Sequence, residues 1–226
     1  MTTELKVLFE DNHLLVVEKP YGVPSQPDPS GDADMLTMAK AYIKAQYNKP
    51  GDVYIGLVHR LDRPTSGVMV FARTSKAAAR LSEQVRGREF EKTYLAVLTA
   101  VPEPERGELR HWLAKDGAAH VARVTQSNAP GAKEAALAYE VLAVQDGLCL
   151  VRVRLLTGRF HQIRAQFADI GCSVYGDMKY GPRNVKAPLA LHACRLCLVH
   201  PTQKKRMCFD SQPARPPFDQ FDIPEV

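Results

Sequence analysis

Short apolar runs bounded by turn residues dominate the hydrophobic pattern of the chain, and such runs are typical of β-strands. The run Leu14–Glu18 is rich in branched residues and is followed by proline and glycine, which interrupt extended structure. Similar runs predict strands at Val68–Ala72, Thr93–Leu98, Leu137–Val144, Leu148–Leu156 and Leu189–Val199. In Leu148–Leu156 valines alternate with Arg152 and Arg154, so one face should be buried and the other basic and open.

Three segments carry helix signals. They are Met35–Tyr47 after the capping residue Asp34, Lys76–Arg86 after Thr74, and His161–Ile170 before Gly171. Many strands with a few helices indicate an α+β fold, a mainly antiparallel mixed sheet with flanking helices. Because no repeat or break in composition marks a boundary, we expect a single catalytic domain over residues 1–226. Its core would be residues 8–201, and residues 202–226 would be a C-terminal extension.

The composition is that of a soluble globular protein, with 45% hydrophobic and 24% charged residues. No apolar run approaches the roughly 18 residues of a membrane span, and the N-terminus lacks the pattern of a secretory signal. We therefore expect a cytoplasmic protein with no membrane association. The net charge is +5, and residues 146–226 hold twelve Lys/Arg against seven Asp/Glu. This surplus favours a polyanionic partner, although a solvated basic surface would have the same composition.

The five cysteines are an odd number and lie mostly among apolar residues. In a cytoplasmic chain this pattern predicts reduced, buried thiols. Cys194 and Cys197 have the spacing of half a zinc site, but no second pair stands at ligand distance in the sequence. We therefore predict a structural role for them and no metal.

The segment His59-Arg60-Leu61-Asp62-Arg63-Pro64-Thr65-Ser66-Gly67 precedes a predicted strand and contains two chain-breaking residues. We expect a turn that exposes Asp62 between Arg60 and Arg63. Two neighbouring cations favour the ionised carboxylate, the form required of a nucleophile or base. Taken alone, the pattern also fits a turn aspartate in local salt bridges.

This segment resembles motif II of the RluA-type pseudouridine synthases, His-Arg-Leu-Asp-x-x-Thr-Ser-Gly, at every fixed position. Other segments resemble further motifs of that family in the same order. They are Lys19-Pro20-x-Gly22, Lys92-Thr93-Tyr94-Leu95-Ala96, Thr157-Gly158-Arg159-Phe160-His161-Gln162-Ile163-Arg164, Gly176-Asp177-x-x-Tyr180-Gly181, and Leu191-His192-Ala193 through His200-Pro201. Several motifs in one order are far more specific than any one of them.

The resemblance implies a pseudouridine synthase fold with a central active-site cleft, where Asp62, Tyr94 and Arg164 converge. Asp62 would be the catalytic carboxylate, Tyr94 would stack on the target base, and Arg164 would pair with the carboxylate. Tyr94 could instead be a core aromatic, and Arg159 competes with Arg164 for the pairing role. The residues expected to contact the substrate are Arg60, His59, Arg159, Thr65 and Leu191. The isomerisation involves no redox change and no group donor, so we expect no cofactor.

Two positions depart from the family pattern: Gln166 replaces a frequent histidine, and Gly171–Val174 differs from the usual Gly-His-Pro-Ile. We expect these to affect substrate choice more than chemistry. We also expect no N-terminal RNA-binding domain, so the catalytic domain itself would recognise a stem-loop in tRNA or rRNA, as a monomer without an obligatory protein partner.

Two other functions remain open at this stage. A non-catalytic RNA-binding protein could share the fold, since a fold does not determine function, but it should have lost Asp62, Tyr94 or Arg164. A hydrolase acting on a glycosidic bond would usually need a second acidic residue as a proton donor, and no motif supplies one.

Overall fold

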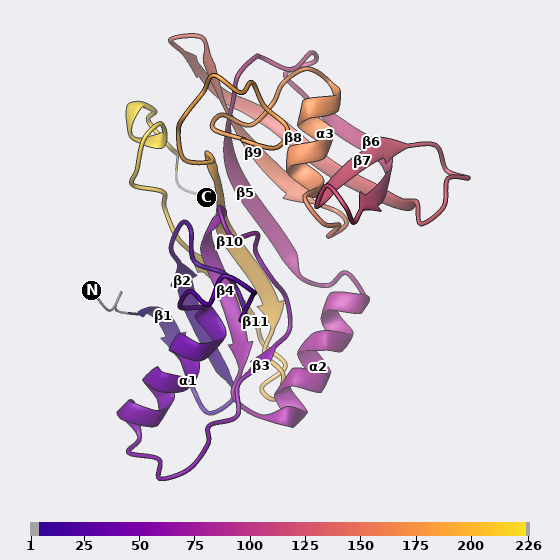
Figure 1. The fold of residues 1–226 in the computed structure, drawn as a ribbon. Coiled ribbons are helices and arrows are strands. Elements are labelled where there is room, and N and C mark those ends of the chain that lie inside the picture. The colour runs from indigo at the N-terminus through magenta and orange to yellow at the C-terminus, as the bar shows by residue number, and fades with distance from the viewer. Residues whose placement is uncertain (1–4, 225–226) are drawn as a thin grey trace. The chain divides into compact units, whose positions relative to one another are not determined.

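A computed structural model describes residues 5–224 and is drawn in Figure 1. The strands in this part of the chain are β1 (Lys6–Glu10), β2 (Leu14–Lys19), β3 (Gly56–Leu57), β4 (Ser66–Ala72), β5 (Glu91–Leu98), β6 (Arg106–Asp116), β7 (Val121–Thr125), β8 (Lys133–Gln145), β9 (Leu148–Leu155), β10 (Leu191–Val199) and β11 (Arg206–Asp210). The helices are α1 (Met35–Gln46), α2 (Ser75–Arg86), α3 (Gln162–Asp169) and the 3-10 helix η1 (Phe218–Gln220). The predicted α+β fold is confirmed, and no described helix is long and apolar enough to cross a membrane.

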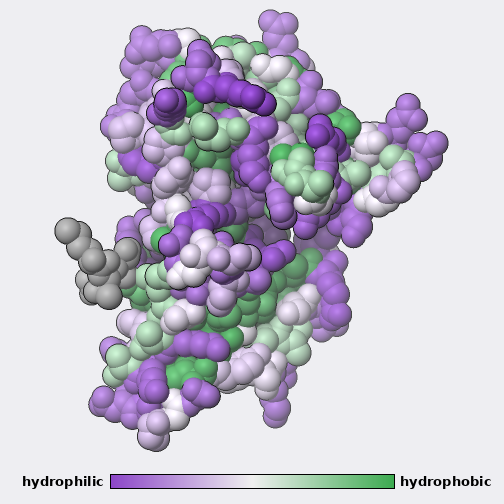
Figure 2. Space-filling model, viewed as in Figure 1, coloured by the Kyte–Doolittle hydropathy of each residue, from purple (hydrophilic) through white to green (hydrophobic). Residues whose placement is uncertain are grey.

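The chain packs into two compact units, Met1–Glu91 with Ala193–Gln212, and Lys92–His192 with Pro213–Val226. In the first unit the strand order is β1-β2-β4-β10, with β3 beside β4 and β11 beside β10. One face of these strands packs on Ala77 and Leu81 of α2. The opposite face is closed as well, since all seven residues of β4 are buried. Figure 2 shows hydrophobic residues gathered in this unit between α1 and α2.

In the second unit the strand order is β5-β9-β8-β6-β7, and each neighbouring pair is antiparallel. Helix α3 contacts β6 and β7 and lies on one face of these strands (Figure 1). Its Ala165 packs with Leu113 and Ala135. This packing fixes the position of α3, the helix that carries the predicted site residue Arg164.

Six predicted strands and three predicted helices are present, with small shifts at their ends. The prediction that a helix starts at His161 is wrong: His161 has φ +51° in the left-handed region, and α3 begins at Gln162. Strands β1, β3, β6, β7 and β11 were not predicted. In β6 exposed or half-buried residues predominate, so its sequence lacks the apolar run that marks a strand.

The prediction of reduced, buried thiols is wrong for two cysteines. Cys197 on β10 and Cys208 on β11 form a disulfide, and Cys208 is exposed. The two residues are direct register partners in antiparallel strands, which brings their Cα atoms to 4.1 Å. Cys149, Cys172 and Cys194 are free and buried, as expected.

Candidate active site

The loop that carries Asp62 in the first unit is fastened by a buried lysine. Lys19 is fully buried at the end of β2, and its Nζ donates to the carbonyl oxygens of Thr65 (2.7 Å), Arg63 (2.9 Å) and Pro20 (3.0 Å). The pairing of Lys19 with Gly67 in the β2–β4 register puts the ammonium beside this loop. Lys19 therefore ties the segment that follows Asp62 to the end of β2.

A second set of hydrogen bonds holds the same loop. The Oγ of Ser25 donates to the carbonyl oxygen of Leu61 (2.7 Å) and accepts from its N–H (3.1 Å). The N–H of Gly22 donates to the carbonyl oxygen of Arg63 (3.0 Å), and the N–H of Thr65 donates to the backbone carbonyl oxygen of Asp62 (2.9 Å). The backbone on both sides of Asp62 is thus fixed, while its side chain is half-buried.

Gly67 closes the loop onto β10. Its φ is +118°, and a Cβ at this position would lie 2.2 Å from the carbonyl oxygen of Ala193. No other residue fits this backbone conformation and this close approach. The glycine of the sequence motif is therefore required by packing.

Replacing Lys19 with methionine tests this fastening. Lys19→Met keeps the apolar stem but leaves three carbonyl groups without their donor, so we expect the free energy of unfolding to fall by about 3 kcal/mol or more. Urea unfolding followed by circular dichroism measures the loss. The matched control is Lys6→Met, since the Lys6 side chain is 65% exposed and bonds Glu18 at the surface. If both variants were equally stable, Lys19 would not fasten the loop.

Neither flanking cation is directed as the sequence suggests, and the ionised state of Asp62 stays a prediction. The guanidinium of Arg63 turns away: it donates to the carbonyl oxygen of Gly22 (2.9 Å) and pairs with Asp32 and Asp28. Arg60 is exposed and makes no ion pair with any residue that the structure describes. Arg63 instead fixes the segment before α1, and Arg60 is available to a ligand.

Two other predicted substrate contacts lie inside the loop. The Nε2 of His59 accepts a hydrogen bond from the N–H of Val70 (3.0 Å). Thr65 is only 2% exposed, and its Oγ1 has no hydrogen-bond partner among residues 5–224. Contact of these two residues with a substrate stays a prediction.

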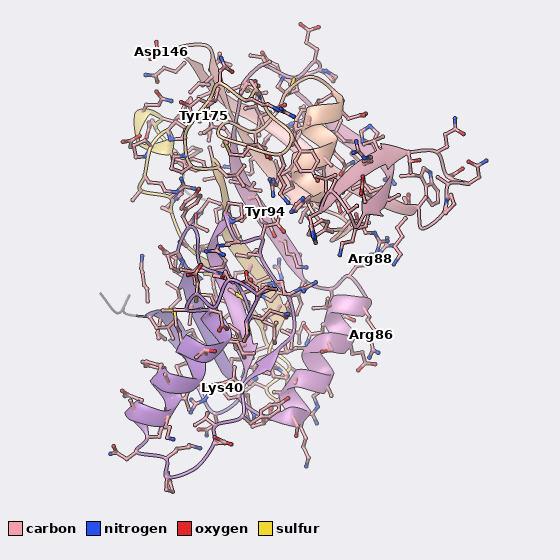
Figure 3. All side chains as sticks on the ribbon, in the orientation of Figure 1. Lys40, Arg86, Arg88, Tyr94, Asp146 and Tyr175 are labelled. Carbon is pink, nitrogen blue, oxygen red and sulfur yellow. A yellow bond between two sulfur atoms is a disulfide. The ribbon has the colours of Figure 1, made fainter. Side chains whose placement is uncertain are left out.

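Tyr94 lies on β5 in the second unit, is labelled in Figure 3, and is 7% exposed. The strand register aligns it with Val153 on β9, which is in turn aligned with Tyr139 on β8. Aligned residues share a sheet face. The ring centres of Tyr139 and of Phe167 on α3 lie 5.5 Å apart. Tyr94 therefore points to the same side of the sheet as α3.

Arg164 on α3 makes a buried, two-pronged ion pair with Asp177. Its Nε donates to Oδ2 (2.7 Å) and its Nη2 to Oδ1 (2.8 Å), and the two side chains are 4% and 0% exposed. Asp177 Oδ1 also accepts the N–H groups of Lys179 (2.9 Å) and Tyr180 (3.1 Å). Asp177 thus fixes both the direction of Arg164 and the turn that follows.

An aromatic pair continues this polar network. Arg164 lies 5.2 Å from the centre of the Tyr180 ring, and the Tyr180 hydroxyl is 2.8 Å from Nδ1 of His161. Burial lowers the pKa of His161 to about 3, and the positive charges of Arg164 and Lys179 act in the same direction. The imidazole is therefore neutral near pH 7, which keeps a further cation out of this network.

The segment before α3 is organised by Gln162. Its Oε1 accepts from the Thr157 hydroxyl (2.7 Å) and from the N–H of Arg159 (2.9 Å). Arg159 donates through Nε to the carbonyl oxygen of Glu134 (2.8 Å), and its two terminal nitrogens bond no described residue. Arg159 is thus held at one end and can bind an anion at the other. Leu191, another predicted substrate contact, is buried at 3% exposure.

Gln166, which departs from the family pattern, is fully buried. Its Nε2 contacts the carbonyl oxygens of Leu109 (3.1 Å) and Ala135 (3.2 Å) and Nδ1 of His111 (3.0 Å). It therefore secures α3 to β6 and β8, and this role in packing was not expected from the sequence.

The structure groups the predicted residues by unit. Asp62, Arg60, His59 and Thr65 belong to the first, and Tyr94, Arg164, Arg159 and Leu191 to the second. The convergence of Asp62 with Tyr94 and Arg164 stays a prediction. Sequence reasoning assigned no role to Lys19 or Asp177, although both lie in quoted motifs. A charged residue in an apolar or glycine-rich setting is the signal that could have identified them, because burial demands a partner.

Comparisons with known proteins identify the family of this chain. Residues 13–169 match the family described as RNA pseudouridylate synthase. The chain is 35% identical to the uncharacterized RNA pseudouridine synthase YhcT of Bacillus subtilis over 88% of its length. It is 34% identical to ribosomal large subunit pseudouridine synthase D of Zymomonas mobilis over 92% of its length. The matched regions span 65% and 69% of those two relatives, about two thirds of each.

A solved structure shows the same fold. Human RNA pseudouridylate synthase domain containing 4 superposes with a TM-score of 0.78 at 25% identity, covering 93% of this chain and 89% of that one. The chain belongs to the RluA-type RNA pseudouridine synthase family, whose members are isomerases.

Proposed function

We propose that this chain is an RNA pseudouridine synthase that isomerises specific uridines in tRNA or rRNA, with Asp62 as the catalytic carboxylate. The observation that carries the proposal is the Asp62 loop. Its backbone is fastened by Lys19 and Ser25 on both sides of a half-buried carboxylate, in a chain of this family. A fixed backbone with one reactive side chain is the preorganisation that a catalytic group needs.

The reaction breaks the bond between ribose carbon 1 and uracil nitrogen 1, and forms a bond from the same carbon to uracil carbon 5. Carbon 5 loses its hydrogen as a proton, and nitrogen 1 gains one, so the atoms balance without a cofactor. The base must leave its stack to reach the protein. In our proposal Tyr94 supplies an aromatic face for it, and Arg164 supplies a cation that opposes the rise in carboxylate pKa on burial.

The recognition groups that we propose are cationic. Arg60 and the terminal nitrogens of Arg159 have no partner among the described residues and are suited to phosphate oxygens. We further propose a target in a stem-loop, where an unstacked base costs least to extrude.

The test uses RNA from cells that lack the gene, labelled with tritium at carbon 5 of uracil. The purified protein should release tritium to water from tRNA or from rRNA, and pseudouridine should appear in the digested product. RNA labelled at carbon 6 is the control, since that hydrogen is retained. If neither tRNA nor rRNA labelled at carbon 5 releases tritium, the proposal is rejected. Release of free uracil would indicate a hydrolase.

A further inference from the structure

The second unit contains a pocket of about 430 Å³ that sequence motifs do not assign. It lies on β5, β6, β8 and β9, and its polar lining consists of Thr93, Arg106, Glu108, Glu140, Arg152 and Arg154. A volume of this size is sufficient for a small ligand or for one unit of a polymer.

The strand register places these side chains on one sheet face. Arg154 is aligned with Thr93 and Ala138, and Arg152 is aligned with Glu140, which is itself aligned with Arg106. The residues between them, such as Val153, point to the side of Tyr94 and α3. These polar side chains therefore lie on the face opposite to Tyr94. The prediction that β9 has a basic, open face is confirmed, because Arg154 is exposed and Arg152 is half-buried.

Both carboxylates of the pocket already have arginine partners. Glu140 accepts from Arg106 (2.5 Å) and Arg152 (2.7 Å), and these bonds hold its pKa below the usual range. Glu108 accepts from Arg110 outside the pocket (2.9 Å), and Arg110 also lies 3.6 Å from Glu134. Neither carboxylate of the pocket is therefore a counter-ion for Arg154.

Two donor groups remain in this arrangement. Arg154 makes no hydrogen bond or ion pair with any residue from 5 to 224. The Nε of Arg152 is buried and has no partner in the same part of the chain. A buried N–H without an acceptor is costly, and the guanidinium of Arg154 is exposed and lacks the counter-charge that an anion in the pocket would supply. The guanidinium group matches phosphate oxygens in charge and geometry.

We infer that this pocket binds a phosphate group of the RNA strand, on the sheet face opposite to Tyr94. The inference rests on the proposed function for the identity of the polymer. A free phosphate has the same chemistry, so the experiment separates the two sources.

The test measures RNA affinity against salt for the wild type and for Arg154→Ala. We expect roughly 10-fold weaker binding, and a slope of log affinity against log salt that is smaller by about 0.7–0.9. Arg154→Lys, which keeps the charge but not the planar donor geometry, should restore the salt slope and recover part of the affinity. Lys40→Ala is the control: it removes one exposed charge from α1 in the other unit (Figure 3) and should change neither quantity by a comparable amount.

Inorganic phosphate is titrated into RNA-free protein in parallel. Phosphate binding that is lost in Arg154→Ala, with RNA affinity unchanged, would assign the pocket to a free anion and overturn the inference. An Arg154→Ala variant that binds RNA as Lys40→Ala does would also overturn it. Tritium release by the wild type tests the proposed function separately. If the wild type releases tritium and Arg154→Ala binds RNA with unchanged affinity, only the inference about the pocket is rejected.

Discussion

Asp62→Asn is expected to abolish pseudouridine formation while the chain stays folded and still binds RNA. The substitution keeps the size of the side chain but removes its charge and its nucleophilic oxygen. The bonds that fix the loop involve backbone atoms, Lys19 and Ser25, and they do not depend on the carboxylate. Tritium release from carbon 5 of uracil should therefore fall by at least about 1,000-fold.

The matched control is Asp52→Asn, because Asp52 is an exposed aspartate in the same unit, before β3. It should release tritium at the wild-type rate. RNA binding by both variants should equal that of the wild type, since phosphate contacts dominate affinity. Appreciable release by folded Asp62→Asn protein would show that Asp62 is not the catalytic carboxylate.

The second large effect is expected at Asp177, where a buried ion pair can be broken. Asp177→Asn removes the charge that accepts two hydrogen bonds from Arg164, inside a site where the two side chains are 4% and 0% exposed. Removing one partner of a buried pair typically costs about 3–5 kcal/mol, because the other charge stays in the interior. We expect a loss of about 3 kcal/mol in the free energy of unfolding, measured with urea.

Asp210→Asn is the control for this prediction. Asp210 also pairs with an arginine in two-pronged geometry, but the side chains of Arg195 and Asp210 are 33% and 49% exposed. A surface pair of this kind is worth about 0–1 kcal/mol. Equal stability losses in the two variants would show that burial does not determine the strength of the Arg164–Asp177 pair. A loss of activity in Asp177→Asn below its unfolding temperature would further indicate that Asp177 positions Arg164.

Local sequence was sufficient for the elements with a strong pattern. The strands at Leu14–Glu18 and Val68–Ala72 and the helix after Asp34 were predicted because apolar runs, turn residues and caps act over a few residues. Strands β6 and β7 were not predicted because each has one buried residue and has polar residues between its apolar ones, so neither contains the apolar run that marks a strand. Strand β6 is held extended by pairing with β7 and β8, and β7 by pairing with β6, and a local pattern does not contain these pairings.

The same division holds for the candidate site. The sequence by itself determined that Asp62 stands in a turn before a strand, and that Arg164 lies on a helix. Only the tertiary structure decided which groups these residues meet. Lys19 reaches the loop because of the β2–β4 register, across 44 and 46 residues of sequence. Arg63 turns to Asp32, and Arg164 to Asp177, because ion pairing depends on distances in the folded chain, and spacing along the sequence does not set those distances.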